Sequence, residues 1–196
     1  MTKLVGIAGS LRRHSYNRGL LMAAVESMPP GVTLEVAAID EIPLYNADIE
    51  DADGVPLVVS RIKDAIAAAD GLLLVTPEYN NGIPGVFKNV IDWLSRPPTD
   101  IPRVFRGKPV ALIGASPGGF GTVLAQNSWL SVLHTLGTRP WSGGRLLVPR
   151  AGSMFDSEGN LMDKDTRERL RGFLEGFVTY VKANDAASTR GESMDS

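Results

Sequence analysis

The sequence contains no cysteine, which excludes disulfides, thiolate metal sites, iron–sulfur clusters and a cysteine nucleophile. Its two histidines, His14 and His134, are too few for a histidine zinc centre, so we expect no metal. The net charge of -2 provides neither the basic surface of a nucleic-acid-binding domain nor a polybasic membrane patch. No stretch reaches the roughly 20 apolar residues of a membrane helix. The first apolar run precedes Arg12 and Arg13, the reverse of a signal peptide. These absences predict a cytoplasmic protein without a nucleic-acid or membrane partner.

What the sequence does have is an alternation of short apolar runs and longer amphipathic segments. Apolar residues make up 43% of the 196 positions, enough for the core of one α/β domain. The continuous apolar runs predict buried parallel strands at residues 4–8, 32–39, 71–76, 109–115 and 145–148. The amphipathic segments predict helices at residues 16–28, 56–69, 84–94, 120–136 and 163–183. This pattern is typical of a doubly wound α/β sandwich, with helices on both faces of one parallel sheet.

Two polar segments fall outside this alternation. Residues 44–54 form an acidic loop that we expect to be a solvated connection. Residues 185–196 are polar and lack aromatic side chains, which predicts a disordered C-terminal tail. We therefore expect a single domain over residues 1–184, followed by that tail.

The loop after the first strand carries Ser10, Arg12, Ser15 and Asn17. In open α/β sheets, ligands bind beyond the carboxyl ends of the strands, so this loop belongs to the candidate site. A phosphate can accept hydrogen bonds from the hydroxyls, the amide and the guanidinium of this loop, and from the free N–H groups at the start of the helix. The loop has neither the P-loop lysine nor the three spaced glycines of a dinucleotide site, so it suits a terminal phosphate monoester. The structural alternative is that Ser15 or Asn17 only caps the helix.

The loop after the third strand, residues 76–85, contains two prolines and two glycines, which fix the backbone and permit close approach by a flat ligand. Tyr79 offers an aromatic face, and Asn80, Asn81 and Gly82 offer backbone N–H donors. Donors near the polar edge of a redox ring stabilise the negative charge that the ring gains on reduction. The alternative is a rigid turn without a ligand.

The loop after the fourth strand contains Ser116 and Gly118 within the sequence Gly-Ala-Ser-Pro-Gly. This matches the G-x-S-x-G elbow of serine hydrolases. We reject a hydrolase because the oxyanion hole needs the N–H of the residue after the nucleophile, and Pro117 has none. The only later histidine, His134, lies within the next predicted helix. The glycines of this loop instead favour packing along a flat cofactor.

Taken together, the three loops resemble those of the NADPH-dependent FMN reductase family of flavodoxin-like proteins, especially its bacterial quinone and chromate reductases. The similarity runs from about Lys3 to about Val181. It is strongest in three segments: Gly9-Ser10-Leu11-Arg12 with Ser15-Tyr16-Asn17, Thr76-Pro77-Glu78-Tyr79-Asn80, and Gly82-Ile83-Pro84-Gly85 leading into residues 88–95. The resemblance implies a five-stranded parallel sheet in the order 2-1-3-4-5, the order of flavodoxin itself. It also implies a homodimer or homotetramer with the flavin near a subunit interface.

The resemblance further implies FMN as the cofactor and a set of residues that bind it. Those implied to hold the phosphate and neighbouring groups are Ser10, Arg12, Ser15, Tyr16 and Asn17. Those implied to border the isoalloxazine ring are Pro77, Glu78, Tyr79, Asn80 and Gly82, with Ser116 and Gly118 nearby. Tyr79 and Glu78 at the ring edge are the candidate catalytic contacts. No acid–base pair is required, because the flavin carries the chemistry.

The implied activity is that of an oxidoreductase with NADPH or NADH as electron donor. In two half-reactions at one site, a ping-pong scheme, it would reduce quinones, flavins or metal oxyanions such as chromate. Two alternatives stay open. One-electron carriers of the flavodoxin type are typically strongly acidic, to dock their partners, whereas this chain has a net charge of only -2. A flavin-free interaction subunit would be colourless, and changes at Arg12 or Asn17 would not affect it.

Overall fold

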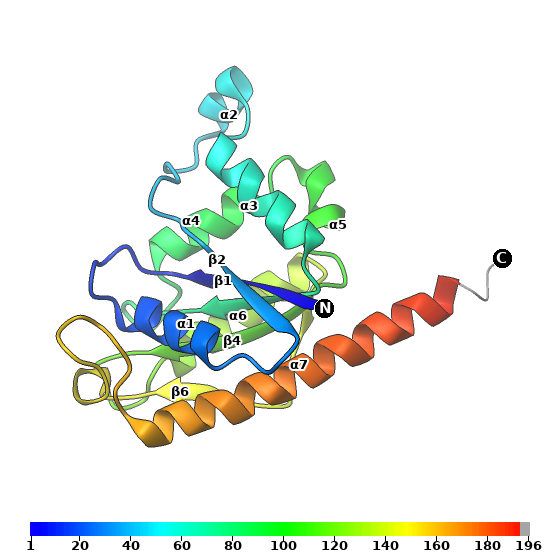
Figure 1. Ribbon diagram of the computed structural model, residues 1–196. Coiled ribbons are helices and arrows are strands. Elements are labelled where there is room, and N and C mark those ends of the chain that lie inside the picture. Colours follow the sequence, from blue (N-terminus) through cyan, green and yellow to red (C-terminus); the bar gives the residue numbers. More distant parts are fainter. Residues whose placement is uncertain (193–196) are drawn as a thin grey trace.

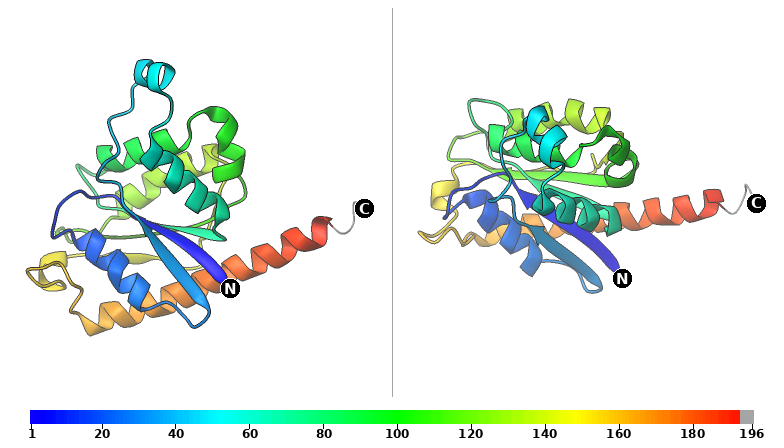
Figure 2. Two further views of the ribbon diagram at one scale, coloured as in Figure 1. Left: turned by 45° about the horizontal axis from the view of Figure 1, so that its top comes forward. Right: turned by 90° about the horizontal axis from the view of Figure 1, so that it is seen from above.

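The computed structural model describes residues 1–192, which form one sheet with helices on both faces (Figures 1 and 2). The strands are β1 (Thr2–Ala8), β2 (Val32–Ala37), β3 (Gly71–Val75), β4 (Pro109–Ala115), β5 (Arg139–Pro140) and β6 (Leu146–Val148). The helices are α1 (Tyr16–Glu26), α2 (Ala47–Asp53), α3 (Leu57–Ala68), α4 (Gly85–Leu94), α5 (Ile101–Val104), α6 (Val123–Thr135) and α7 (Lys164–Glu192). There are also two short 3₁₀ turns, η1 (Pro98–Asp100) and η2 (Ala151–Ser153).

All neighbouring strands of the sheet are parallel, and their order is β2-β1-β3-β4-β5, with β6 also paired to β4. This confirms the predicted doubly wound α/β fold and the order 2-1-3-4-5. One detail differs at the edge beyond β4, where the sequence predicts a single strand over residues 145–148. There β5 pairs with the first residues of β4 and β6 with its last residues, so two short strands share the fifth position.

Trp141 interrupts this edge of the sheet. Its N–H donates to the Val110 carbonyl (2.8 Å), continuing the pairing of β5 by one residue. Its indole ring packs against α7, with its centre 4.8 Å from that of the Phe173 ring. A Cβ on Gly143 or Gly144 would lie only 2.5 or 2.8 Å from the indole. The chain therefore passes the partly buried ring of Trp141 through two glycines, Gly143 and Gly144, before β6 pairs with β4.

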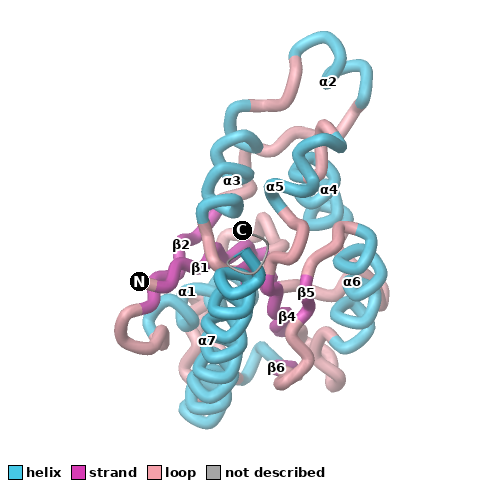
Figure 3. Tube along the Cα trace, turned by 90° about the vertical axis from the view of Figure 1, so that its right-hand side faces the viewer, coloured by secondary structure: helices cyan, strands magenta, loops and turns pink. Residues whose placement is uncertain are grey.

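Side chains on the two faces of the strands form two separate cores. On one face, Leu4 of β1 and Leu73 of β3 pack with α1 and α7. On the other face, Val5, Leu72 and Leu74 pack with α3, α4, α5 and α6. Figure 3 shows these two layers of helices. All five residues of β3 are buried, because a central strand of a parallel sheet has no solvent-facing side, and its sequence is accordingly apolar throughout.

The acidic stretch predicted as a solvated loop contains a short helix, α2, which projects at the top of Figure 1. The Asn46 side chain caps this helix by accepting the Asp48 N–H (2.9 Å), and acidic side chains lie in its first turn, where the helix dipole favours them. None of its residues is buried, so the stretch is solvated but helical. Its base is fixed to α4, because the Trp93 indole N–H donates to the Pro43 carbonyl (2.9 Å).

The last helix, α7, is longer than the sequence predicts. It runs from Lys164 to Glu192, so residues 185–192 of the segment expected to be disordered are helical. Residues 193–196, the rest of that segment, lie outside the described residues. The division into a domain over residues 1–184 and a tail over residues 185–196 stays a prediction.

Candidate active site

The carboxyl ends of β1, β3 and β4 lie side by side, because the parallel register pairs Ala8 with Val75 and Val75 with Ile113. The loops after these strands therefore converge on one edge of the sheet. They enclose a cavity of about 130 Å³, lined by Ser10, Arg12, Ser15, Tyr16, Asn17, Pro77, Glu78, Tyr79, Ala115, Ser116 and Pro117. Nine of the twelve residues predicted to bind the cofactor line this cavity, and the other three, Asn80, Gly82 and Gly118, lie on the same loops.

The loop after β1 supplies hydrogen-bond donors for an anion. Ser15 caps α1, and its buried hydroxyl accepts the N–H of Arg18 (3.3 Å). Tyr16 and Asn17 lie in the first turn of the helix, where backbone N–H groups find no acceptor within the helix itself. The exposed guanidinium of Arg12 lies 5.6 Å from the centre of the Tyr16 ring. In the described chain no carboxylate pairs with Arg12, so its donors are available.

Asn17 makes a contact that the sequence does not reveal. Its buried side chain donates to the Ala115 carbonyl (2.8 Å) and accepts the Ala115 N–H (2.9 Å). The amide thereby joins α1 to the last residue of β4 beneath the cavity. Because the side-chain oxygen and one side-chain N–H are committed to the fold, the backbone N–H of Asn17 is the better donor for a phosphate.

Residues 79–82 form a tight turn in the loop after β3. Tyr79 and Gly82 exchange two backbone hydrogen bonds, of 3.2 and 3.1 Å. Between them, Asn80 and Asn81 have φ angles of 50° and 61°, left-handed conformations that asparagine tolerates better than most side chains. The N–H groups of these two asparagines have no acceptor within residues 1–192, and the Tyr79 side chain is 49% exposed. The turn combines free donors with an aromatic surface beside the cavity.

Glu78 reaches from the same loop to the start of α6. Its carboxylate oxygen Oε2 accepts the N–H groups of Leu124 (2.8 Å) and Ala125 (2.9 Å). Thr122, at the N-cap position of α6, makes no side-chain cap bond. Glu78 therefore supplies the cap from another loop, and the positive end of the helix dipole favours its charge. Besides the predicted place at the ring edge, this carboxylate fixes two loops of the site to each other.

The loop after β4 is held by its own hydroxyl and by β6. The buried Ser116 hydroxyl donates to the Gly121 carbonyl, and the Ser116 N–H donates to the Val148 carbonyl (3.0 Å). His134 lies in the last turn of α6, the end away from this loop. Among the described residues Ser116 therefore has no histidine base, which agrees with the rejection of a serine hydrolase.

Sequence reasoning missed a fourth segment of the site, residues 149–153 after β6. The Arg150 N–H donates to the Gly118 carbonyl (2.9 Å), and the Ala151 N–H donates to the Ser116 carbonyl (3.0 Å). The segment therefore supports the loop after β4 from behind. The signal that identifies it is its position, because, like the other three loops, it follows the carboxyl end of a parallel strand.

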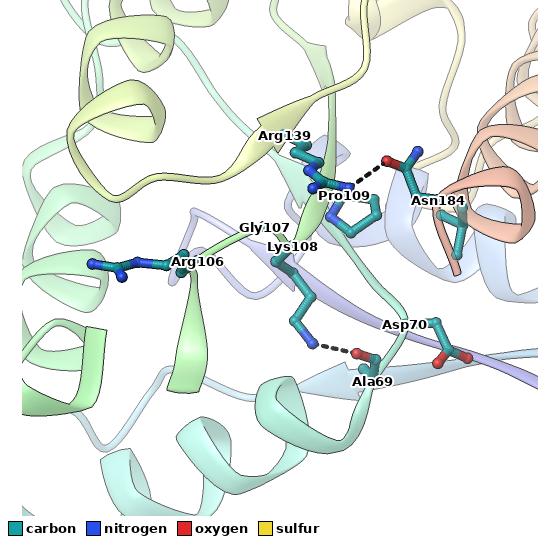
Figure 4. Close-up of a pocket in the computed structure, with 9 residues that line it drawn as sticks. Ala69, Asp70, Arg106, Gly107, Lys108, Pro109, Arg139 and Asn184 are labelled. Atoms are coloured by element: carbon teal, nitrogen blue, oxygen red, sulfur yellow. Dashed lines mark hydrogen bonds between the residues drawn. The ribbon is translucent and has the colours of Figure 1, made fainter. Parts of the chain in front are cut away.

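A larger cavity, of about 230 Å³, lies at the opposite edge of the sheet (Figure 4). Arg106, Lys108 and Arg139 line it, and Figure 4 shows Arg106 pointing away from the other two. The Lys108 ammonium donates to the carbonyls of Ala67 and Ala69 at the end of α3, where the helix dipole favours a cation. Burial lowers the pKa of Lys108. Because the Lys108 ammonium is engaged by these carbonyls, we assign this cavity a role in the fold. The cavity of about 130 Å³ at the carboxyl ends of the strands is the candidate active site.

The described part of the chain contains neither a metal-ligand cluster nor a membrane-spanning helix. No group of three or more histidine, aspartate or glutamate side chains in this part of the chain is placed to hold a metal ion. None of its helices combines the length and the apolar character needed to cross a membrane.

The fold and the site together define a class of protein. Flavodoxin-like flavin proteins are built on a doubly wound parallel sheet in this order. This chain adds hydrogen-bond donors suited to a phosphate after β1 and a turn with free N–H groups after β3. The family model described as NADPH-dependent FMN reductase matches residues 2–153. The chain therefore belongs to the NADPH-dependent FMN reductase family.

Relatives and a solved structure agree with this assignment. The chain is 43% identical over 180 residues to an NAD(P)H-dependent FMN reductase of Pseudomonas aeruginosa, covering 92% of this chain and 95% of that protein. It is 38% identical to a 2-hydroxy-1,4-benzoquinone reductase of Burkholderia sp, covering 92% and 96%. Its structure is similar to that of FerB, a flavoenzyme NAD(P)H:(acceptor) oxidoreductase from Paracoccus denitrificans. The TM-score is 0.82 and the identity 33%, over 94% of this chain and 99% of FerB. These findings confirm the family resemblance, the class of enzyme and FMN as the cofactor.

Proposed function

We propose that this protein is an FMN-dependent reductase that takes electrons from NADPH or NADH and reduces small acceptors. The acceptors are quinones, flavins or metal oxyanions such as chromate. The observation that carries this proposal is the convergence of the loops after β1, β3 and β4 on one cavity at the ligand-binding edge of the sheet. The names of the two bacterial relatives support the electron donor and support quinones as acceptors.

The residues around the cavity fit FMN by the chemistry of their donors. A phosphate dianion needs N–H and O–H groups and positive charge, which the first turn of α1, Ser10 and Arg12 provide. Among the described residues Glu78 is the only carboxylate that lines the cavity, and two N–H groups of α6 already bind its Oε2. The free N–H groups of Asn80 and Asn81 suit the polar edge of the isoalloxazine ring.

We propose a ping-pong order, in which the oxidised nicotinamide leaves before the acceptor enters. Bound FMN would supply the redox chemistry, accepting a hydride and passing on two electrons. The chain binds and orients the reactants, and the exposed Tyr79 and Pro117 border the side from which they enter. In the part of the chain that the structure describes, no histidine lines the cavity, in keeping with a reaction that needs no protein acid–base pair.

Initial-rate kinetics test this proposal. Rates are measured against NADPH at several fixed concentrations of 1,4-benzoquinone, with FMN bound to the protein. Parallel double-reciprocal lines are expected, and intersecting lines would contradict the ping-pong order. Bound flavin without turnover by NADPH or NADH would favour the one-electron carrier, and a protein that binds no flavin would favour the interaction subunit.

We further propose that the protein forms a homodimer or homotetramer through the outer surface of α6. Phe120, just before this helix, and Leu124 and Leu130 within it are 82%, 43% and 49% exposed. Three large exposed apolar side chains on one helix and its N-terminal flank favour an interaction surface there. Sedimentation velocity is expected to show a dimer or tetramer, and a monomer at micromolar concentration would contradict this. The cytoplasmic location also stays a proposal.

A further inference from the structure

Arg150 is held in an unfavourable backbone conformation next to the candidate active site. Its φ and ψ are 48° and 45°, in the left-handed region where a Cβ crowds the backbone. Its N–H donates to the Gly118 carbonyl (2.9 Å), and its own carbonyl accepts the N–H and the hydroxyl of Ser153 (3.0 and 2.9 Å). These bonds fix the position of Arg150 relative to the loop after β4, which lines the cavity. Non-glycine residues in this conformation often mark functional sites.

The Arg150 guanidinium is exposed, and among the described side chains, those of residues 1–184, it has no carboxylate or hydrogen-bond partner. Several other arginines pair with carboxylates, among them Arg96 with Glu50 and Arg103 with Asp64. An unpaired cation beside a site that binds anionic molecules raises their local concentration there. The arrangement leaves the whole side chain of Arg150 available to an incoming anion.

The location of Arg150 separates it from the residues suited to the FMN phosphate. Those residues lie on the loop after β1 and line the cavity, as Arg12 does. Arg150 follows β6, contacts the loop after β4 through its backbone, and does not line the cavity. An exposed arginine outside the cavity but adjoining its wall suits a molecule that enters and leaves, rather than a resident cofactor.

We propose that Arg150 is a specificity residue that binds the anionic group of an incoming substrate. A guanidinium pairs with a phosphate or sulfonate through two parallel hydrogen bonds, which makes it selective for such groups. Two sources carry this chemistry: the 2′-phosphate of NADPH, which NADH lacks, and an anionic group on the electron acceptor. This inference rests on the proposed reductase function.

The test compares charged and uncharged substrates in matched pairs. The variants are Arg150→Ala, Arg150→Gly, which removes the charge and also relieves the backbone, and Arg150→Lys, which keeps the charge without the planar fork. Arg106→Ala, an exposed arginine at the opposite edge of the sheet, changes the net charge equally and is the control. Values of kcat/KM are measured for NADPH and NADH with 1,4-benzoquinone. With NADH as donor, they are then measured for anthraquinone-2-sulfonate and 1,4-benzoquinone. FMN affinity is measured separately.

We expect both neutral variants to lower kcat/KM for NADPH about tenfold while that for NADH changes less than about twofold, as loss of one charge-assisted contact predicts. The kcat/KM of Arg150→Lys for NADPH should lie between those of the wild type and the neutral variants, and that of Arg106→Ala should equal the wild-type value. If the selective loss is instead on anthraquinone-2-sulfonate, the anionic group is that of the acceptor. Equal losses for charged and uncharged substrates, no loss, or weaker FMN binding would each overturn the proposal. Failure of the proposed function would be recognised separately, by absence of turnover of the wild type with both NADPH and NADH.

Discussion

Replacing Glu78 with alanine tests how the loops of the candidate active site are held together. The change removes the acceptor of two hydrogen bonds, from the N–H groups of Leu124 (2.8 Å) and Ala125 (2.9 Å). Loss of a helix N-cap costs about 0.5–2 kcal/mol, and loss of a carboxylate at the positive end of a helix adds about 0.3–1 kcal/mol. We therefore expect the free energy of unfolding to fall by about 2 kcal/mol. For a domain of this size that corresponds to a decrease in Tm of about 4–8 °C.

Thermal unfolding of the FMN-free protein, followed by circular dichroism, measures this loss independently of catalysis. Glu78→Gln keeps a side-chain oxygen at the same reach and should retain most of the stability. Glu175→Ala, at an exposed position on α7, is the control for a glutamate-to-alanine change and should lie within about 0.5 kcal/mol of wild type. FMN affinity should fall for the Glu78→Ala variant, because Tyr79 follows directly on the loop that is released. A Tm equal to that of the wild type, or a glutamine variant as unstable as the alanine variant, would refute a hydrogen-bonded cap.

Three further predictions concern the stability of the fold. Asn17→Ala leaves a buried N–H and C=O of β4 unpaired and should lower the free energy of unfolding by about 2–4 kcal/mol in urea titrations; an unchanged midpoint would contradict this. Gly143→Ala should cost about 1–3 kcal/mol in the same assay, because its Cβ would lie 2.5 Å from the Trp141 indole, and a neutral effect would show that the indole can move. The hydrogen bond from Lys63 chiefly lowers the pKa of Asp100 below its ordinary value of 3.8. Its contribution to stability is thus present above that pH and lost as the pH falls through the lowered pKa. Asp100→Asn should make the free energy of unfolding depend less on pH in the acid range. An unchanged slope would contradict a stabilising contact between Lys63 and Asp100.

The sequence predicts the parallel strands and the loops of the site, because both follow from local patterns, whereas the order of the strands follows from the family resemblance. Fully apolar runs such as β3 indicate strands covered on both faces, and such strands align their carboxyl ends at one edge. A loop with hydroxyls and an arginine before a helix indicates an anion site without knowledge of its neighbours. These signals suffice to place Ser10, Arg12 and Tyr79 around one cavity.

The remaining features depend on contacts between segments far apart in the sequence. The Asn17 amide bonds a residue 98 positions away, and the Glu78 carboxylate a helix 46 positions away. No local pattern specifies either partner, so from the sequence Asn17 and Glu78 are predicted only as cofactor ligands. The division of the edge strand likewise depends on Trp141 finding space against α7. Residues 149–153 follow the general rule for ligand sites, but their role requires the backbone contact between Arg150 and Gly118.

The reductase activity itself is best tested by an anaerobic titration of the FMN-loaded protein with NADPH, followed by visible absorption. We expect a bound-flavin spectrum that bleaches on addition of NADPH and returns when 1,4-benzoquinone is added. Bound flavin that neither NADPH nor NADH bleaches would contradict a reductase and indicate a one-electron carrier. A protein that binds no FMN would contradict the assignment of the cavity itself.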